Sequence, residues 1–383
     1  MAAKKDATES NDGNPYDVVV VGAGAAGVGV GISLQHVGIE NYVVVDRASV
    51  GASFAAWPAE TRFITPSFPS NSIGMLDLNS IGIGISPAFN MRIEHPTGPE
   101  YAEHLQSLAE FFELPLRENT DVLSIEKKDD LFHLETKKET LLAKNVIWAA
   151  GEYQYPSLGV FDGSETCRHT STIASYTELE GDDFLIVGGY ESGIDAAYHL
   201  AKNDKSVRVF DLNRPWAEAS SDPSIALSTY SFERMRHEKF GANVELFEET
   251  GVQSVAHEDG LYTLTTDKGQ VFQSATQPIL ANGFDGSHKF VSHLFEQRDD
   301  GFPSVNEKDE STIVPGMYLC GPSVRHDGHI FCFIFKYRQR FGIVVEAIAS
   351  SLGLETEDFV EAYKSWGMYL DDLSCCGQEC LTC

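Results

Sequence analysis

Three glycines near the start of the chain have the spacing of a phosphate-binding turn. Gly22, Gly24 and Gly27 follow a GxGxxG pattern, and Asp46 lies 24 residues after the first of them. The first glycine permits a tight turn, the second lets the backbone approach a pyrophosphate, and the third lets a helix pack closely on a strand. An acid placed like Asp46 can accept a hydrogen bond from a ribose hydroxyl. The pattern predicts a dinucleotide site.

A second and less regular copy of this pattern begins at Gly188. Gly188, Gly189 and Gly193 supply small residues for another turn, and Ser192 precedes the last of them. Tyr190 stands where the second glycine of the fingerprint belongs, and its β-carbon limits how closely a pyrophosphate can approach. The copy predicts a second nucleotide site at these glycines and Ser192, with a duplicated fold that binds no ligand as the alternative.

The acid that follows the second copy bears on which nucleotide would bind. Asp211 ends the next predicted strand, where a carboxylate suits the free ribose 2′-hydroxyl of NADH. Arg214 follows closely and could instead hold the 2′-phosphate of NADPH. The sequence therefore leaves both nucleotides open.

Four of the seven cysteines crowd into the last nine residues. Cys376 with Cys380, or Cys380 with Cys383, could carry electrons by thiol–disulfide exchange, so we predict these three as catalytic residues. Together with Cys375 they could also hold zinc, although the spacing is too compact for two CxxC knuckles, and we assign no metal ligands. An incidental tail is the third alternative, because acidic neighbours would raise the thiol pKa values and slow attack.

Other candidate side chains lie in a loop and in apolar runs. Residues 48–71 are rich in small residues, aromatics and proline, which is typical of a loop that lines a site. We expect Ser53 and Trp57 to face a bound ring system. Cys320 and Cys332 lie in apolar runs, so we expect both to be buried and unreactive.

Apolar runs flank both glycine turns and predict the elements that position them. Val18–Val21 and Tyr42–Val45 read as buried parallel strands on either side of a helix. Phe184–Val187 and Val207–Phe210 repeat this arrangement, which indicates an internal duplication. We predict an α/β fold with two Rossmann-like three-layer dinucleotide-binding domains. Residues 325–353 are expected to form a turn and a long helix.

Length and charge narrow the class of protein. A chain of 383 residues exceeds what one core usually supports. The net charge of −29 argues against sequence-independent binding to nucleic acid or to an anionic membrane. No apolar run reaches the roughly 18 residues of a membrane span. The polar N-terminus lacks the apolar core of a secretion signal, so we expect a cytoplasmic protein.

Two glycine fingerprints, the second inserted into the first unit, resemble the two-dinucleotide-binding-domain flavoproteins. This superfamily includes thioredoxin reductases, bacillithiol-disulfide-reductase-like proteins and flavin-containing monooxygenases, and the resemblance covers about residues 15–350. It implies that FAD binds at Gly22, Gly24, Gly27 and Asp46. It also implies that NAD(P)H binds at the second fingerprint.

The resemblance further implies a role for the segment that returns to the first unit. It would place Gly321 and a helix N-terminus near the flavin ring, where Arg325 or His326 could stabilise a reduced anionic flavin. The expected division of the chain is a disordered leader (1–14), an FAD-binding domain (15–155), an NAD(P)-binding domain (156–284), the return of the FAD domain (285–370) and a cysteine-rich tail (371–383).

The motifs do not decide the subfamily. Thioredoxin and glutathione reductases carry a cysteine pair near the flavin, and neither of those pairs is present in this sequence. Monooxygenases carry a FxGxxxH fingerprint before the second unit. Phe161 and Gly163 match it, but Cys167 takes the place of the histidine, and His169 lies two residues later. Residues 192–195 do match the SGxD of that family.

We therefore predict an FAD-dependent oxidoreductase that oxidises NAD(P)H and passes electrons through the flavin to a thiol- or disulfide-type acceptor. A flavin monooxygenase that uses NAD(P)H and O₂ on a small nucleophile is the alternative. A non-catalytic flavin- or metal-binding redox sensor is the second alternative. Expected partners are a small-molecule substrate or low-molecular-weight thiol or disulfide, and a second copy of the chain as a homodimer.

Overall fold

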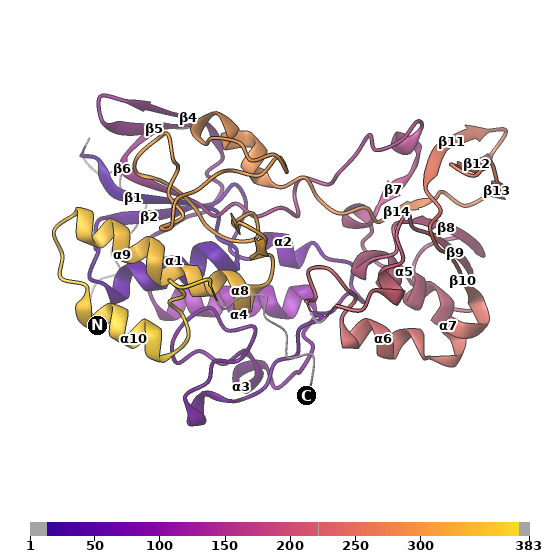
Figure 1. Ribbon diagram of the computed structural model, residues 1–383, viewed down its shortest axis with the longest axis horizontal. Helices are drawn as coiled ribbons and strands as arrows, with labels where there is room; N and C mark the ends of the chain where they lie inside the picture. Colours follow the sequence, from indigo (N-terminus) through magenta and orange to yellow (C-terminus); the bar gives the residue numbers. More distant parts are fainter. Residues whose placement is uncertain (1–13, 221, 375–383) are drawn as a thin grey trace.

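The computed structural model describes residues 14–220 and 222–374 and contains two α/β units side by side (Figure 1). The first unit is built on a seven-stranded sheet in the order β3-β2-β1-β6-β5-β4, with β15 paired to β6 off this path. Its strands are β1 (Tyr16–Val21), β2 (Tyr42–Val45), β3 (Leu116–Arg117), β4 (Val122–Lys128), β5 (Leu131–Thr136), β6 (Thr140–Trp148) and β15 (Met317–Leu319).

Valine-rich parallel strands form the centre of this sheet. β1 pairs with both β2 and β6, so that Val19 lies opposite Val43 on one side and Val146 on the other. Val19 is fully buried, as expected for a strand that is covered on both faces. The covering helices include α1 (Ala25–His36), α4 (Gly98–Phe111) and α9 (Phe341–Ser351), and α1 contacts both of the others.

The chain leaves this sheet after β6 and returns to it with β15, whose Leu319 lies opposite Trp148. The segment between them forms a five-stranded sheet, β10-β9-β8-β14-β7, and an antiparallel sheet, β11-β12-β13. The predicted insertion of one α/β unit into the other is therefore confirmed. The strands are β7 (Arg168–His169), β8 (Asp183–Val187), β9 (Ser206–Phe210), β10 (Val244–Phe247), β11 (Val252–Glu258), β12 (Leu261–Thr266), β13 (Val271–Ser274) and β14 (Ile279–Leu280).

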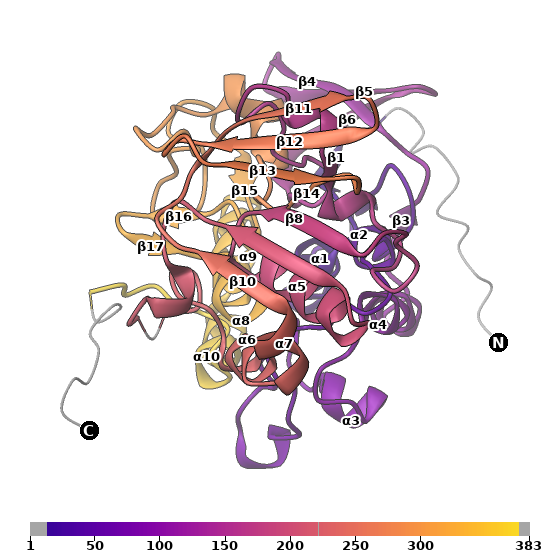
Figure 2. The same cartoon turned by 90° about the vertical axis from the view of Figure 1, so that its right-hand side faces the viewer.

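Helix α5 (Glu191–Lys202) lies on the side of the second sheet that faces the first unit (Figures 1 and 2). It buries Ile194 and Leu200 in the core of the second unit, which is separate from the core around β1. Helices α6 (Thr229–Met235) and α7 (Glu238–Asn243) pack beside it. The start of α5 is thus placed at the junction of the two units.

The expected turn and long helix at residues 325–353 are confirmed, with one irregularity. A short hairpin comes first, and the helix then runs without a gap from Ile334 to Ser351, with one 3₁₀ turn whose backbone keeps right-handed helical angles. Arg338 donates to the Ser80 carbonyl at 2.9 Å, and Arg340 donates to the Asp309 carboxylate at 2.9 Å. The elements are β16 (Arg325–His326), β17 (His329–Ile330), α8 (Ile334–Tyr337), a 3₁₀ turn (Arg338–Arg340) and α9.

Short helices complete the chain: α2 (Ala52–Ala55), α3 (Pro87–Met91) and α10 (Glu357–Ser365). Within residues 14–220 and 222–374, no helix has both the length and the apolar character needed to cross a membrane.

Candidate functional site

Two adjoining cavities meet at the first glycine turn. The larger, of about 440 Å³, is walled by residues of both units, and the smaller, of about 230 Å³, is lined by the last residues of β1 and β2. Both are walled by Gly22, Asp46, Ala150 and Gln154. They therefore offer an elongated site on both sides of the turn, which suits an extended dinucleotide.

The backbone of this turn fits a pyrophosphate. Gly22 has φ of +109°, and a β-carbon on Gly27 would lie 1.7 Å from the Gly22 carbonyl oxygen, so neither position accepts a side chain. A β-carbon on Gly24, in contrast, would meet no protein atom within 4 Å among the described residues. Asp46 accepts hydrogen bonds from the N–H groups of Ala23 (2.8 Å) and Ala48 (2.7 Å), and burial raises its pKa against these donors. The turn thus has the close packing and the open face that FAD requires.

The second glycine turn repeats this geometry. Gly188 has φ of +103°, and a β-carbon on Gly193 would lie 1.9 Å from the Gly188 carbonyl oxygen. Asp211 accepts hydrogen bonds from the N–H groups of Gly189 (2.6 Å) and Asn213 (2.7 Å). The two turns therefore share their backbone fold and the bonding of their acids.

Tyr190 marks the difference between the turns. The φ and ψ of Tyr190, −80° and −166°, match the −82° and −167° of Gly24. The Tyr190 side chain therefore occupies, at the second turn, the space that is left open beside Gly24 at the first turn. A nucleotide at this turn must pass the Tyr190 side chain, whose exposed fraction is 39%. Ser192, two residues later, lines the larger cavity and connects the second turn to it.

The loop after Asp46 supplies an aromatic wall of the larger cavity. Trp57 lies with its ring centre 5.3 Å from that of Phe54 and 5.1 Å from that of Phe63. Ser53 also lines the cavity and accepts a hydrogen bond from the Gln154 amide at 3.2 Å. The structure therefore places Ser53 and Trp57 at the cavity, where a planar ring system would contact them.

The larger cavity also contains a thiol. Cys332 lines it, with Sγ 3.0 Å from the Ser224 hydroxyl, which in turn accepts from the Lys336 ammonium at 2.8 Å. Burial raises the pKa of Cys332, and the Ser224 hydrogen bond and the Lys336 charge oppose this shift. We expected both Cys320 and Cys332 to be buried: Cys320 is buried, whereas Cys332 is only partly buried and lines the cavity.

A carboxyl group stands on the same wall. Glu152 follows the sharp turn at Gly151, where the chain leaves β6, and it lines the larger cavity. None of the described residues hydrogen-bonds to its carboxyl or forms an ion pair with it. Burial raises the pKa of Glu152, and the charge of Arg325 opposes the shift. Glu152 is therefore suited to hold a proton in the cavity.

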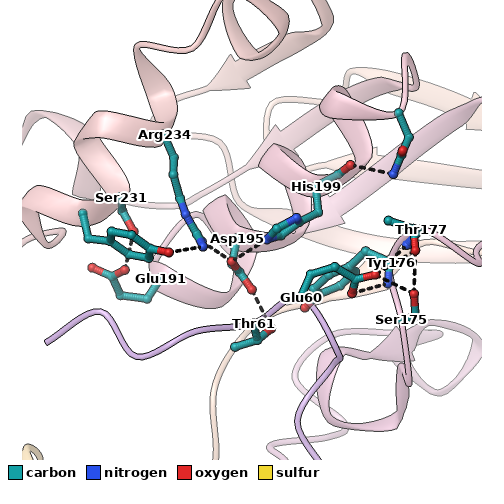
Figure 3. Close-up of polar contacts among 12 residues, drawn as sticks. Glu60, Thr61, Ser175, Tyr176, Thr177, Glu191, Asp195, His199, Ser231 and Arg234 are labelled. Carbon is teal, nitrogen blue, oxygen red and sulfur yellow. Dashed lines mark hydrogen bonds and ion pairs between the residues drawn. The ribbon is translucent and has the colours of Figure 1, made fainter. Parts of the chain in front are cut away.

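Buried polar side chains join the units beside the cavity (Figure 3). Asp195 of α5 accepts from the Thr61 hydroxyl of the first unit at 2.6 Å and from Arg234 of α6. His199 Nε2 lies 3.3 Å from the same carboxylate. Burial alone would raise the pKa of Asp195, but the His199 contact and the Arg234 charge outweigh it and lower the pKa. Asp195 thus stays ionised and fixes Thr61 at the cavity wall.

Helices α5 and α6 are held together next to this network. Glu191 accepts from the Ser228 N–H and from the Ser231 hydroxyl, each at 2.5 Å, and burial raises the pKa of Glu191. His95 of the first unit stacks on Tyr230 of α6 with ring centres 4.0 Å apart. These contacts position the α5–α6 end of the cavity against the first unit.

Glu60 makes a second polar connection between the units (Figure 3). Its carboxylate accepts from the hydroxyls of Ser175 (2.6 Å) and Thr177 (2.8 Å) and from the Tyr176 N–H (3.0 Å). Burial opposes ionisation, but these donors dominate and lower the pKa of Glu60 to about 2. The carboxylate therefore ties the loop of the first unit to the start of the second.

Two predicted residues of the return segment lie outside the larger cavity. His326 Nε2 is 2.5 Å from Asp309 Oδ1, and Arg340 donates to the same carboxylate, so His326 belongs to a buried ionic cluster. Arg325 donates to the Pro322 carbonyl at 2.6 Å. Neither side chain lines the larger cavity, although the charge of Arg325 acts on Glu152 and Cys332, which do. The roles expected for His326 and Arg325 stay predictions.

The turn at Gly321 does reach the first glycine fingerprint. Gly321 has φ of +104°, and a β-carbon there would lie 3.3 Å from the Ala26 side chain at the start of α1. Pro322 lines the larger cavity. The return segment thus completes the wall of the proposed flavin site.

The predicted catalytic cysteines, Cys376, Cys380 and Cys383, lie outside the described residues. Among residues 14–220 and 222–374, no group of three or more His, Cys, Asp or Glu side chains is arranged to hold a metal ion. His169 is buried and lies 3.0 Å from the Gly283 carbonyl, which is a structural contact.

Several residues at the cavity have weak signals in the sequence. An acid directly after the glycine that follows β6 could have pointed to Glu152, because ligands of α/β folds bind beyond the carboxyl ends of the strands. Arg234 lies 39 residues from Asp195, and Cys332 lies 108 residues from Ser224. No local pattern predicts pairs at such separations.

Comparison with known proteins gives a family match over most of the chain. The sequence profile of the pyridine nucleotide-disulphide oxidoreductases matches residues 19–321. Bacilliredoxin reductase Bdr from Bacillus subtilis is 24% identical over 347 residues, which cover 86% of this chain and 97% of that protein. An NADH dehydrogenase from the same organism is 26% identical over 333 residues, which cover 84% of this chain and 56% of that protein.

A further relative matches a shorter part. An uncharacterized CzcO-like oxidoreductase from Geobacillus kaustophilus is 33% identical over 113 residues, which cover 28% of this chain and 32% of that protein. The chain thus spans about a third of this relative and little more than half of the NADH dehydrogenase.

Solved structures share the fold. Bacillithiol disulfide reductase Bdr from Staphylococcus aureus has a TM-score of 0.72 at 19% identity, over 88% of this chain and 99% of that one. Thioredoxin reductase from T. acidophilum has a TM-score of 0.65 at 20% identity, with the same coverage. A flavin-containing monooxygenase from Stenotrophomonas maltophilia has a TM-score of 0.64 at 16% identity, again over 88% and 99%. At these low identities, it is the TM-scores that establish a common fold.

Proposed function

We propose that this FAD- and NAD(P)H-dependent oxidoreductase reduces a low-molecular-weight disulfide. The chain belongs to the pyridine nucleotide-disulphide oxidoreductase family. The similarity to bacilliredoxin reductase over 97% of that protein supports this class of acceptor. So does the shared fold with bacillithiol disulfide reductase.

The observation that carries the proposal is the composition of the larger cavity. It adjoins the first glycine turn, reaches α5 of the second unit, and contains the Cys332 thiol and the Glu152 carboxyl. The thiolate form of Cys332 can attack a disulfide and form a mixed disulfide, and a protonated carboxyl can supply the proton that the departing thiolate needs. Two electrons supplied by a bound, reduced flavin would then break the mixed disulfide and release the second thiol. The raised pKa of Glu152 favours the protonated form.

The residues that would hold FAD are those of the first turn. Gly24 leaves room for the pyrophosphate, Asp46 would accept a hydrogen bond from the ribose, and Trp57 and Ser53, which line the larger cavity, would contact the ring system. When bound, FAD supplies the transfer of two electrons from the nicotinamide to the acceptor. The protein orients the partners, and its aromatic wall excludes water from the cavity.

Thr61 and Asp195 both line this cavity, and their hydrogen bond joins the two units there. The cysteines Cys376, Cys380 and Cys383 remain proposed carriers of electrons to an acceptor outside the cavity. Truncation after Leu373 should then abolish reduction of a disulfide that cannot enter the cavity, such as one in a protein, while flavin reduction by the nicotinamide and reduction of small disulfides persist.

Stopped-flow spectroscopy on the purified protein tests the proposal. The protein should be yellow and release FAD on denaturation, NADH or NADPH should bleach it without oxygen, and oxidised glutathione or cystine should restore the colour. A colourless protein that neither FAD nor FMN refills would refute flavin dependence. Rapid reoxidation by O₂ with no response to any disulfide would favour the monooxygenase alternative.

A further inference from the structure

We infer that the second nucleotide site selects NADH over NADPH because acidic side chains lie around the end of β9, where the ribose 2′ position of a bound nucleotide would come. The inference rests on the proposed function, because it concerns the electron donor of that reaction. It follows from the charged groups around the end of β9, which lie beyond the larger cavity.

Asp211 is the first of these groups. It ends β9 in the position that Asp46 has at the end of β2, and its bonds to Gly189 and Asn213 are to backbone N–H groups, which leave its negative charge in place. Each carboxylate oxygen can accept a second hydrogen bond. A ribose 2′-hydroxyl can donate one, whereas a 2′-phosphate would bring a charge of about −1.5 to −2 against the carboxylate.

The nearby Arg214 already has two acidic partners. Arg214 is the only cation in the sequence from Asp211 to Glu218. Its guanidinium lies 3.7 Å from Glu248 and 3.9 Å from Glu249, in the loop that follows β10. The two loops are bonded together, since the Glu249 N–H donates to the Asn213 carbonyl. A 2′-phosphate that approached Arg214 would therefore meet two carboxylates beside it.

Other groups at this end keep the balance negative. Lys268 is a second cation, and its ammonium lies 3.4 Å from the Thr250 hydroxyl. The charges of Asp211 and Glu218 both act on Tyr190, whose pKa is raised by burial and by these two acids. The carboxylates near the loop that follows β9 thus include those of Asp211, Glu218, Glu248 and Glu249, and the cations there include Arg214 and Lys268.

A 2′-phosphate and the acids around the end of β9 would repel each other. Because these acids are partly exposed, solvent weakens the repulsion, and we expect it to lower the affinity for the phosphorylated nucleotide by at least about tenfold. Calorimetric titration of the FAD-loaded protein with ADP-ribose and with 2′-phospho-ADP-ribose measures this directly, because the two ligands differ only in the phosphate. We expect ADP-ribose to bind at least about tenfold more tightly, with a smaller difference at high salt.

Variants assign the effect to the acids. The double change Glu248→Gln and Glu249→Gln should strengthen binding of 2′-phospho-ADP-ribose several-fold and leave ADP-ribose almost unaffected. Glu258→Gln, an exposed glutamate at the end of β11, serves as the matched control and should change neither. Arg214→Gln should not weaken binding of the phosphorylated ligand.

Equal or tighter binding of 2′-phospho-ADP-ribose, lost on Arg214→Gln, would overturn the inference and leave the proposed function intact. If neither ligand binds, the second turn is no nucleotide site, and both the inference and the NAD(P)H half of the proposed function fall. Anaerobic bleaching by NADH at lower concentrations than NADPH is the expected companion result.

Discussion

Replacement of Glu60 by Gln should loosen the connection between the two units. The Glu60 carboxylate accepts hydrogen bonds from Ser175, Tyr176 and Thr177, and these lower its pKa from 4.5 to about 2. A fall of this size corresponds to about 3 kcal/mol in a fully buried site. Because Glu60 is partly exposed, we expect about 1–2 kcal/mol after solvent screening.

The pH dependence has a definite sign. The folded pKa lies below the ordinary value, so the carboxylate stabilises the folded state above about pH 4.5, and this contribution is lost as the pH falls toward 2. The advantage of the native protein over the Glu60→Gln variant should therefore be full at pH 7 and largely gone near pH 2.

Hydrogen exchange of the Tyr176 and Thr177 amides provides the assay, because both N–H groups donate to Glu60. Loss of 1–2 kcal/mol should speed their exchange at pH 7 by about 5- to 30-fold. Glu178→Gln, at an exposed neighbouring glutamate, is the matched control and should leave both amides unchanged. Equal exchange rates in the Glu60→Gln and native proteins at pH 7 would show that Glu60 does not stabilise this connection.

Four further predictions concern the cavity and its supports. Gly24→Tyr should fold normally, since no described atom lies within 4 Å of the new β-carbon, but should weaken FAD binding at least about tenfold, measured by flavin absorbance after dialysis; full retention of FAD would contradict this. Cys332→Ser should lower disulfide turnover at least about tenfold without slowing flavin bleaching, whereas Cys320→Ser, at a buried thiol outside the cavity, should affect turnover much less; equal losses would remove Cys332 from the mechanism. Glu152→Gln should flatten the fall of disulfide turnover as the pH rises through the raised pKa of Glu152, because the protonated form is the donor; an unchanged pH profile would exclude that role. His326→Gln should lower the free energy of unfolding in urea by about 1–3 kcal/mol, because it removes the bond to Asp309. The rate of flavin bleaching should not change, because His326 lies outside the cavity; a large loss of this rate at native stability would instead support a catalytic role of His326.

The glycine turns and their strands could be predicted from the sequence because their determinants are local. A β-carbon on Gly27 would collide with the carbonyl of Gly22 only five residues away, and Val18–Val21 is apolar because β1 is covered on both faces. Even the departure at Tyr190 was evident, since it interrupts a fixed spacing. The insertion of the second unit could also be predicted, because the same local pattern occurs twice in the sequence.

The walls of the cavity could not be predicted in this way. Cys332 looked like a core residue because its neighbours are apolar, and the choice between core and cavity depended on the contact of Cys332 with Ser224 of the second unit. The helix that follows is held by buried bonds of Arg338 and Arg340 to Ser80 and Asp309. His326 looked catalytic because it follows a glycine turn, yet Asp309 binds it in a cluster of its own.

Two dinucleotide units and the position of each glycine turn follow from the sequence, because steric limits on the backbone and short-range periodicity act within a few residues. Only the folded structure shows which acids and thiols share a cavity, and that Glu60 and Asp195 join the two units. Such contacts join segments more than a hundred residues apart, and their energy depends on burial and on hydrogen-bond geometry, which only the folded chain defines.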